Sequence, residues 1–344
     1  MARTLRGYQG FIVSDTVSGP SAAIADALLS LVRGSQRVVL TGPEGPDGDS
    51  IGACLALRRV LLVAAPGVHV DVVGAVSARY SFLADYSLLL PNSAAAGADG
   101  VVVLDGDCTR LPAVVTAAFG AARWTGLIDH HHSTDMDGYT VSLLDSKSES
   151  TCGMVAALAA KWGVVIGPEL AELLYMGVVF DTGAFRYSNT KPSTHRLAAE
   201  LVETGIDHSN IVLRTLVERR PAALRLMGMV FGGAQFAPDG RSLVGAVSLD
   251  TLRMAGAKES DLDGVVDVLQ HIEGVEVAAL VTERKGVAKV SLRSRGALNV
   301  ATIAQSLNPS GGGHAKAAGC VVPMQDFDAL VEHIGRVLEA ATQG

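Results

Sequence analysis

The chain has 344 residues, of which 49% are hydrophobic but only 5% aromatic, and its formal net charge is −7 at pH 7. This length accommodates two domains with cores built mainly from Ala, Val and Leu, and no stretch approaches the roughly 18 uninterrupted apolar residues of a membrane span. The negative charge argues against tracking along long nucleic acid, which needs a broad basic surface, but it permits a short nucleotide in a local cationic pocket. The N-terminus lacks the apolar block of a secretory signal and the four cysteines are scattered, so we expect free thiols in a cytoplasmic protein.

The first 180 residues alternate short β-branched runs with helical patterns. Such alternation, with continuous runs of Val, Ile and Leu, is typical of a parallel sheet that is covered by helices on both faces. We therefore predict an α/β fold with a doubly wound N-terminal domain. The expected strands are 37–41, 68–73, 101–104 and 126–128, and the expected helices are 21–32, 50–63, 151–162 and 169–179.

The pattern changes in the last third of the chain. Residues 191–231 have a helical pattern, and after them we expect strands at 242–249, 275–282 and 287–292, a helix at 300–307, a Gly-rich loop at 310–314, a strand at 320–322 and a closing helix. This order predicts a second, smaller α/β domain. The predicted organisation is an N-terminal extension (1–20), a catalytic domain (21–205), a helical connector (206–235) and a C-terminal domain (236–344).

Acidic and histidine residues collect directly after the predicted strands and after the helix at 169–179. They are Asp47, Asp49, Asp105, Asp107, Asp129, His130, His131, His132 and Asp181. One Asp-Gly pair after a strand is typical of a turn, but four such segments at the carboxyl edge of one sheet, where open α/β sheets bind ligands, indicate a site. Clustered carboxylates repel one another unless a divalent cation compensates their charge.

The mixture of carboxylate and imidazole ligands favours manganese, with iron, cobalt and zinc as alternatives. The Asp-x-Asp spacing of Asp47 and Asp49 lets two carboxylates point toward adjacent metal positions, and a carboxylate from another strand end can bridge them. Two metals about 3.5–4 Å apart clamp a phosphate and generate a hydroxide nucleophile near neutral pH. The cluster therefore fits phosphoester hydrolysis better than redox chemistry.

These motifs, in this order, resemble the DHH phosphoesterase superfamily. The resemblance rests on Pro46-Asp47-Gly48-Asp49-Ser50-Ile51-Gly52, on Asp129-His130-His131 after an apolar strand, and on residues 177–187. Val290-Ser291-Leu292-Arg293-Ser294 and Gly311-Gly312-Gly313-His314-Ala315 are similar to the associated C-terminal substrate domain of the branch that contains oligoribonucleases (nanoRNases) and 3′,5′-bisphosphate nucleotide phosphatases. The resemblance covers nearly the whole chain from about Gln36 onward.

The resemblance implies a role for each matching residue. Asp47 and Asp105 would hold one manganese ion, and Asp49, Asp105, His130 and Asp181 would hold the second, with Asp105 bridging. His131 would face the substrate phosphate, and Asp129 would orient the neighbouring histidines. The substrate would be bound by Arg293, Arg295, His314 and the amides of Gly311, Gly312 and Gly313. Ser150 and Thr151 match a family Ser-Thr pair, which we interpret as a helix cap.

Three positions depart from the family pattern. The first motif of the family usually begins with a metal-ligand histidine four residues before the position of Asp47, and Pro43 stands there instead. His132 is additional, and Ser133-Thr134 replaces the family's Asn after the histidine pair. Because Pro43 has no side-chain donor, we predict that the first metal is bound weakly or through water.

We expect a manganese-dependent phosphodiesterase that hydrolyses very short oligoribonucleotides or linear dinucleotides, such as pGpG or pApA, to mononucleotides. Bisphosphorylated 3′,5′-nucleotides and cyclic dinucleotides are further candidate substrates. The alternative, favoured by Pro43, is a degenerate nucleotide sensor with weak hydrolysis. An inorganic pyrophosphatase shares the metal motifs, but Arg293 and the Gly-rich loop fit it less well. The resemblance also implies a homodimer.

Overall fold

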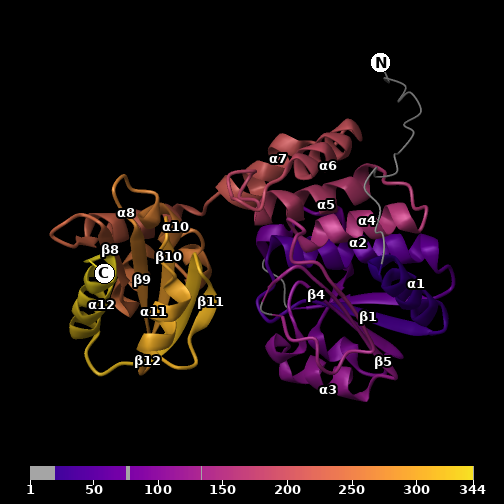
Figure 1. Cartoon of the computed structure of the whole chain (residues 1–344), viewed down its shortest axis with the longest axis horizontal. Helices are drawn as coiled ribbons and strands as arrows, with labels where there is room; N and C mark the ends of the chain where they lie inside the picture. Colours follow the sequence, from indigo (N-terminus) through magenta and orange to yellow (C-terminus); the bar gives the residue numbers. More distant parts are fainter. Residues whose placement is uncertain (1–19, 75–77, 133, 344) are drawn as a thin grey trace. The chain divides into compact units, whose positions relative to one another are not determined.

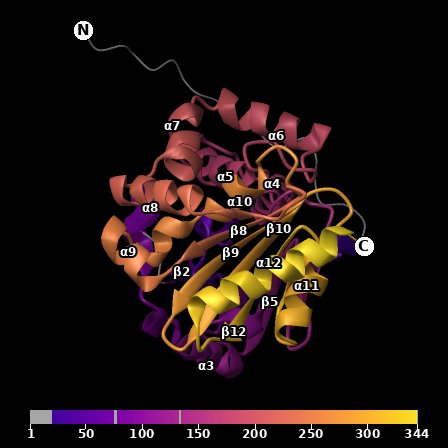
Figure 2. The same cartoon turned by 90° about the vertical axis from the view of Figure 1, so that its left-hand side faces the viewer.

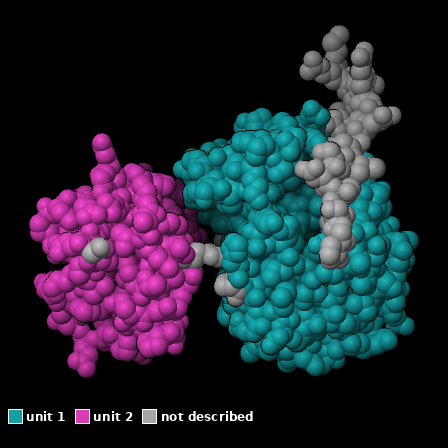
Figure 3. Space-filling view, in the orientation of Figure 1, with its two compact units in different colours: residues 1–218 teal, residues 219–344 magenta. Residues whose placement is uncertain are grey.

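The computed structural model describes residues 20–74, 78–132 and 134–343, and the chain divides into two compact units, residues 1–218 and 219–344 (Figure 1, Figure 3). Apart from Pro20, the expected N-terminal extension lies outside the described residues. Each unit is built around its own sheet. No helix in the described part of the chain is both long and apolar enough to cross a membrane.

Unit 1 is built on a parallel sheet with the strand order β3-β2-β1-β4-β5-β6. Its strands are β1 (Arg37–Thr41), β2 (His69–Val73), β3 (Leu89–Leu90), β4 (Gly100–Leu104), β5 (Trp124–Asp129) and β6 (Val141–Leu144). Its helices are α1 (Pro20–Arg33), α2 (Gly48–Ala64), α3 (Ala113–Ala121), α4 (Thr151–Lys161), α5 (Pro168–Asp181), α6 (Pro192–Glu203) and α7 (His208–Val212). Shorter helical turns are η1 (Ala78–Tyr80), η2 (Ala84–Leu88), η3 (Asn92–Ala95), η4 (Cys108–Arg110) and η5 (Leu213–Val217). The strand order reverses between β1 and β4, which is where sheets of this kind form a ligand crevice.

Both faces of this sheet carry a hydrophobic core, because alternate side chains of a strand point to opposite faces. Val38 and Leu40 of β1 belong to the larger core, which includes residues of α1, α2, α4 and α5, whereas Val39 packs in the smaller core with Val115 of α3. Figure 1 shows these helices on the two sides of the strands. The predicted parallel sheet with helices on both faces is therefore confirmed.

Unit 2 contains a mixed sheet with the order β11-β12-β10-β9-β8-β7, in which β8 and β9 are parallel and the other neighbours antiparallel. Its strands are β7 (Gln235–Phe236), β8 (Ser242–Val247), β9 (Val277–Arg284), β10 (Val287–Ser294), β11 (Gly312–His314) and β12 (Ala317–Pro323). Its helices are α8 (Pro221–Gly232), α9 (Leu249–Ala255), α10 (Val265–Gln270), α11 (Val300–Leu307) and α12 (Phe327–Gln343), with a short turn η6 (Glu259–Leu262). α11 and α12 share one core with the sheet, α8 and α10 share the other, and Figure 2 shows α12 lying across the strands.

The division between the units falls between Glu218 and Arg219, within the segment 206–235 that was expected to be a connector. In this segment α7 packs with α5 in unit 1, and α8 packs with α9 and β8 in unit 2. The predicted strand at 37–41 and the predicted helix at 300–307 have the predicted bounds.

Two differences from the predicted elements affect candidate site residues. The helix after β1 begins at Gly48 rather than Ser50, which places Asp49 in its first turn. The predicted loop at 310–314 contains an edge strand, because Gly312, Gly313 and His314 pair with β12. β3, β6 and β7 were not predicted, since strands of two to four residues are too short to show a periodic pattern.

Candidate metal centre

The loop after β1 positions the first two carboxylates. Asp47 caps α2, because its Oδ1 accepts hydrogen bonds from the backbone N–H groups of Asp49 and Ser50 at 3.0 and 3.1 Å. The side chain of Asp49 is fully buried. Its oxygens accept from the backbone N–H groups of Thr151 at 2.6 Å and Cys152 at 2.9 Å, at the start of α4. A helix N-terminus favours an anion, so these amides hold Asp49 in place as a carboxylate.

The loop after β4 contributes Asp105, which is 3% exposed and has a left-handed backbone with φ of 63°. Its Oδ2 accepts from Ser50 Oγ at 2.5 Å, and its Oδ1 accepts from Thr151 Oγ1 at 3.0 Å. Thr151 therefore contacts the centre in addition to starting α4. Ser150 caps this helix, as predicted, by accepting from the N–H of Gly153 at 2.9 Å.

The end of β5 supplies Asp129 and the two histidines that follow it. Asp129 is fully buried, and its Oδ1 accepts from the backbone N–H of His130 (2.7 Å), from that of His131 (3.2 Å) and from His131 Nδ1 (2.7 Å). Its Oδ2 accepts from the hydroxyl of Thr134. Because four donors occupy its two oxygens, Asp129 is better suited to orienting the histidines than to binding a metal. His132 is exposed.

His130 lies between two acidic residues from other elements. Its Nε2 is 2.8 Å from Oδ2 of Asp181, the last residue of α5, and 3.6 Å from Oδ1 of Asp105. Its Nδ1 lies 3.3 Å from the carbonyl of Ser148, which can only accept, so we assign the proton of the neutral ring to Nδ1. Nε2 then presents a lone pair to carboxylate oxygens.

Burial and mutual repulsion perturb the acid–base properties of the cluster. Burial raises the pKa of Asp49 and of Asp105 to about 7, and repulsion among these carboxylates and Asp181 adds to the rise. Burial and the charges of Asp105 and Asp181 also raise the pKa of Asp47. Burial lowers the pKa of His130, but the hydrogen bond and charge of Asp181 outweigh it and raise the value to about 10. A cluster that retains protons near neutral pH is one that a divalent cation can neutralise instead.

The donor atoms meet the requirements of a divalent metal site. Among the described residues, two groups each offer four ligand atoms that lie within 4.8 Å of one another: Asp49, Asp105, His130 and Asp181, and Asp105, Asp129, His130 and His131. The buried Nε2 of His130 faces the carboxylates of Asp181 and Asp105, at 2.8 and 3.6 Å. An imidazole nitrogen directed at carboxylates from two other elements is the arrangement expected where the three groups can share a cation. The residues therefore fit a divalent cation of the manganese, iron or zinc class.

Two of the acidic residues singled out from the sequence lie outside both groups. Asp107 caps η4, where its Oδ1 accepts from the backbone N–H of Thr109 at 2.9 Å and its Oδ2 accepts from that of Asp135 at 3.2 Å. Asp47 uses its Oδ1 to cap α2. Asp105 is close enough for its negative charge to add to burial in raising the pKa of the Asp47 carboxyl. Asp107 thus has a structural role, whereas Asp47 borders the cluster.

Small residues behind the centre were not recognised from the sequence as part of it. A Cβ on Gly177 of α5 would lie 2.2 Å from Cys152 Sγ and 2.3 Å from Asp49 Oδ1, so only glycine leaves room for the buried carboxylate. A Cβ on Gly52 would lie 2.8 Å from the carbonyl of Leu173, so α2 and α5 also require glycine there. Glycine inside a helix costs stability, so a glycine in the interior of each of two predicted helices could have indicated that these helices pack closely there.

Pro43, at the departure from the family motif, is buried and packs on the loop of Asp105. A Cβ built on Gly106 would lie 3.5 Å from the Pro43 ring. Glu44 is exposed, and its backbone N–H donates to the carbonyl of Arg110 at 2.8 Å. Neither residue belongs to the two groups of ligand atoms among the described residues.

The candidate substrate residues of unit 2 have partners of their own. Arg293 donates from Nε to Oδ1 of Asp267 at 2.7 Å, and Arg295 donates from Nη2 to the carbonyl of Gln270 at 3.4 Å. The amide of Gly311 donates to the carbonyl of Asn308 at 2.7 Å, and Gly312 and Gly313 belong to the strand that pairs with β12. The side chain of His314, on β11, lies outside what the structure describes.

Known proteins resemble this chain over most of its length. A model of the DHH family, N-terminal domain, matches residues 37–178, and a model of the DHHA1 domain matches residues 246–340. The protein named bifunctional oligoribonuclease and PAP phosphatase NrnA from Thermus thermophilus is 33% identical over 304 residues, which are 87% of this chain and 87% of that protein. The protein of the same name from Bacillus subtilis is 27% identical over 83% of this chain and 89% of its own length.

A similar fold occurs among solved structures. An exopolyphosphatase-related protein from Bacteroides fragilis superposes with a TM-score of 0.83 at 24% sequence identity. The superposition covers 93% of this chain and 96% of that one. Both units therefore have counterparts in a known structure, and the similarity concerns the fold alone.

Proposed function

The chain belongs to the DHH family, and on that premise we propose that it is a manganese-dependent phosphodiesterase that hydrolyses very short oligoribonucleotides and linear dinucleotides to mononucleotides. The observation that carries the proposal is one group of ligand atoms in unit 1 that lie within 4.8 Å of one another, from Asp49, Asp105, His130 and Asp181. The names of the two similar proteins support a short oligoribonucleotide as the substrate and PAP as a second one.

Two divalent cations, when bound, would supply positive charge that polarises the phosphoryl group and makes a water acidic enough to attack near neutral pH. We assign the first ion to Asp47 and Asp105 and the second to Asp49, Asp105, His130 and Asp181. Support for a shared Asp105 comes from its place in the group with Asp49, His130 and Asp181, and from its charge, which adds to burial in raising the pKa of the Asp47 carboxyl. The hydroxyls of Ser50 and Thr151 hold its two oxygens in fixed directions.

Asp129 and His131 act together in this proposal. The hydrogen bond from His131 Nδ1 to Asp129 is the main reason why the pKa of His131 is raised, so the imidazolium form is favoured. The ring is 27% exposed and can therefore reach a bound phosphate. A charged imidazole donates a strong hydrogen bond to phosphoryl oxygen and stabilises the negative charge that develops there during hydrolysis.

Unit 2 would bind the rest of the substrate through Arg293, Arg295, His314 and the Gly-rich segment. Asp267 accepts from Nε of Arg293 and the carbonyl of Leu292 accepts from its Nη1, so we expect Nη2 to meet the phosphate. On the same premise we propose a cytoplasmic homodimer. A reducing compartment agrees with the four cysteines, all of which are free thiols.

The test of the proposed function is a substrate panel with manganese. We expect mononucleotides to be released from pGpG or pApA, with slower release from longer oligomers, and we expect EDTA to abolish release because the carboxylate cluster cannot act without its cations. Cyclic dinucleotides and a 3′,5′-bisphosphate nucleotide define the limits of specificity. Dinucleotide binding without turnover at any manganese concentration would instead support the sensor that Pro43 suggests.

The first metal site should be the weaker one, because Pro43 offers no ligand where the family has a histidine. We expect Pro43→His to raise the affinity of this site by at least about tenfold, since even an indirect metal-site partner is worth 10–100-fold. Manganese titration followed by electron paramagnetic resonance, with anomalous scattering to locate the ions, measures the two affinities. Pro43→Ala is the matched control and should leave both unchanged. Equal occupancy of two sites at limiting manganese in the unaltered protein would contradict the prediction.

A further inference from the structure

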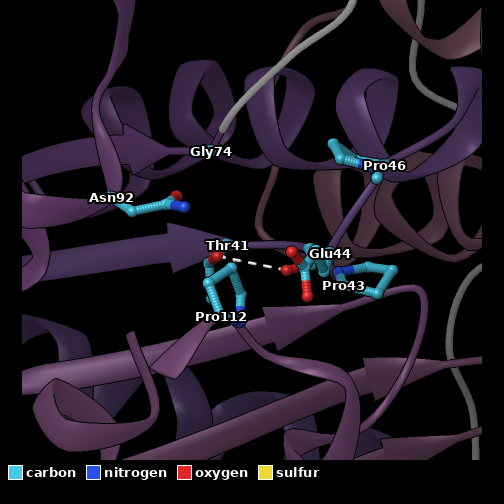
Figure 4. A pocket seen from close by; sticks show the side chains of 9 residues that line it. Thr41, Pro43, Glu44, Pro46, Gly74, Asn92 and Pro112 are labelled. Carbon is cyan, nitrogen blue, oxygen red and sulfur yellow. Dashed lines mark hydrogen bonds between the residues drawn. The ribbon is translucent and has the colours of Figure 1, made fainter. Parts of the chain in front are cut away.

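A pocket in unit 1 lies beside the metal centre and contains none of the candidate metal ligands. It is lined by Thr41 and by Pro43, Glu44 and Pro46 of the loop after β1, together with Asn92 at the start of η3 and Pro112 before α3 (Figure 4). Its empty volume is about 320 Å³, a value that includes solvent at its open mouth, so the enclosed part of the pocket is smaller. The pocket is therefore a small recess that can take a single flat ring system at most and not a whole nucleotide.

The pocket and the metal centre share a wall. Pro46 directly precedes Asp47 in the sequence, and the ring of Pro43 packs against Gly106, the neighbour of Asp105. In the sheet, β2 and β3 lie on one side of β1, whereas β4 and β5, which carry metal-ligand candidates, lie on the other. The pocket, which reaches Asn92 after β3, therefore extends the carboxyl edge of the sheet away from the metals.

The lining has the chemistry of a site for a flat, neutral ring. Three proline rings provide apolar walls, and Figure 4 shows the amide of Asn92 pointing across the pocket toward the loop that carries Pro43 and Glu44. Among the described residues that line the pocket there is no Lys, Arg or His, and Glu44 contributes a carboxylate, so phosphate is an unsuitable occupant. Stacking on apolar walls combined with hydrogen bonds to the edge of the ring is how proteins read an unpaired base.

The polar groups favour a base that donates hydrogen bonds. The Oδ1 of Asn92 is buried and accepts no hydrogen bond within the described residues. A buried acceptor without a donor is costly, and a ligand N–H group would satisfy it. Glu44 also only accepts when ionised. Guanine presents an N–H and an amino group side by side on its pairing edge, whereas adenine presents one amino group beside an acceptor.

We propose that this pocket is a nucleobase subsite that prefers guanine and that Asn92 and Glu44 determine this preference. The identity of the occupant rests on the proposed nucleotide substrate. Asn92→Ala removes the amide without removing a helix cap, because the Asn92 side chain does not cap η3. Glu44→Gln keeps the shape of the side chain but removes its charge. Ser93→Ala, at the exposed neighbouring position, is the matched control.

The experiment compares kcat and KM for pGpG and pApA with manganese in the unaltered protein and the three variants. We expect Asn92→Ala and Glu44→Gln each to raise the KM for pGpG about tenfold, the first by removing one hydrogen bond and the second by replacing a charged acceptor with a neutral one. We expect kcat, the KM for pApA and the manganese affinity to stay within about twofold. Ser93→Ala should leave all four quantities unchanged.

Direct binding separates this proposal from the proposed function. Calorimetry with GMP and AMP should give tighter binding of GMP, and Asn92→Ala should remove the difference. If the protein hydrolyses no dinucleotide but retains this Asn92-dependent preference, the pocket is a base site and the proposed reaction is wrong. If pGpG is hydrolysed and both variants keep the original KM, or if both substrates lose kcat equally, the subsite is refuted.

Discussion

Asp105→Asn is expected to lower kcat/KM for a linear dinucleotide by at least about a thousandfold, because the carboxylate shared by both ligand groups is removed. Asparagine is a better replacement than alanine here. Asp105 has φ of 63°, a left-handed conformation that Asn tolerates and Ala does not. The amide oxygen can still accept from one of the hydroxyls of Ser50 and Thr151, and the other hydroxyl can rotate to accept from the amide nitrogen, so the loop should keep its shape. The assay is initial-rate hydrolysis of pGpG over a range of manganese concentrations.

The matched control is Asp107→Asn, two residues along the same loop. Asp107 is also buried, but it caps η4 and belongs to neither ligand group. We expect this variant to lose about 1 kcal/mol of stability, because the amide nitrogen cannot accept from the N–H of Asp135, while retaining most activity. If both variants were equally inactive, damage to the loop rather than loss of a ligand would explain the result. Full activity of Asp105→Asn would overturn the assignment of the site.

Stability gives a second readout for Asp105→Asn. In the metal-free protein Asp105 is buried beside other carboxylates, and the variant removes this repulsion. The Tm of the metal-free variant should therefore exceed that of the metal-free parent, by on the order of 5 °C at pH 8. In the presence of manganese the order should reverse, because only the parent gains the binding energy of the ions. An active centre that destabilises its own fold is a common compromise between function and stability.

The sequence predicted the position of the centre because one rule of sheet topology was sufficient. Side chains that follow parallel strands meet at one edge of the sheet, so Asp49, Asp105 and His130 could be grouped without any contact being known. Asp181 was grouped with them from its place after the predicted helix at 169–179, and in the structure it is the last residue of α5. The hydrophobic pattern of the strands was equally direct, as β1 shows with its predicted bounds.

The remaining features depend on contacts between distant segments, which no local pattern contains. Ser50 and Thr151 bind Asp105 from two different helices, and the need for glycine at position 177 arises only when α5 packs on α2 and α4. Asp107 follows the same strand as Asp105 and looks equivalent in the sequence, but in the structure its side chain caps η4. Likewise β11 pairs through backbone groups with β12, which the glycine-rich sequence does not indicate.

The stability of the metal-free protein should fall as the pH rises from about 4 to about 8. An unfolded aspartate has a pKa of about 3.9, whereas those of Asp49 and Asp105 in the folded protein are raised to about 7. Between these values the folded state holds more protons than the unfolded state, so the free energy of unfolding decreases with increasing pH. His130 also lowers the free energy of unfolding as the pH rises, but between its ordinary pKa of about 6.5 and its raised pKa of about 10. In that range the folded state keeps a proton on His130 that the unfolded state has lost.

Bound manganese should abolish the fall in stability with rising pH, because the cation replaces the protons on the carboxylates. The cation is also bound more tightly as the pH rises, since its ligands are then deprotonated. The difference in Tm between manganese-bound and metal-free protein should therefore grow between pH 5 and pH 8, by on the order of 5–10 °C. Differential scanning calorimetry at several pH values, with EDTA or excess manganese, measures it. Other acids also titrate, so the decisive comparison is with Asp105→Asn, whose metal-free Tm should decline less steeply with pH. A metal-free Tm with the same slope in both proteins would mean that the buried carboxylates are not coupled to folding in this way.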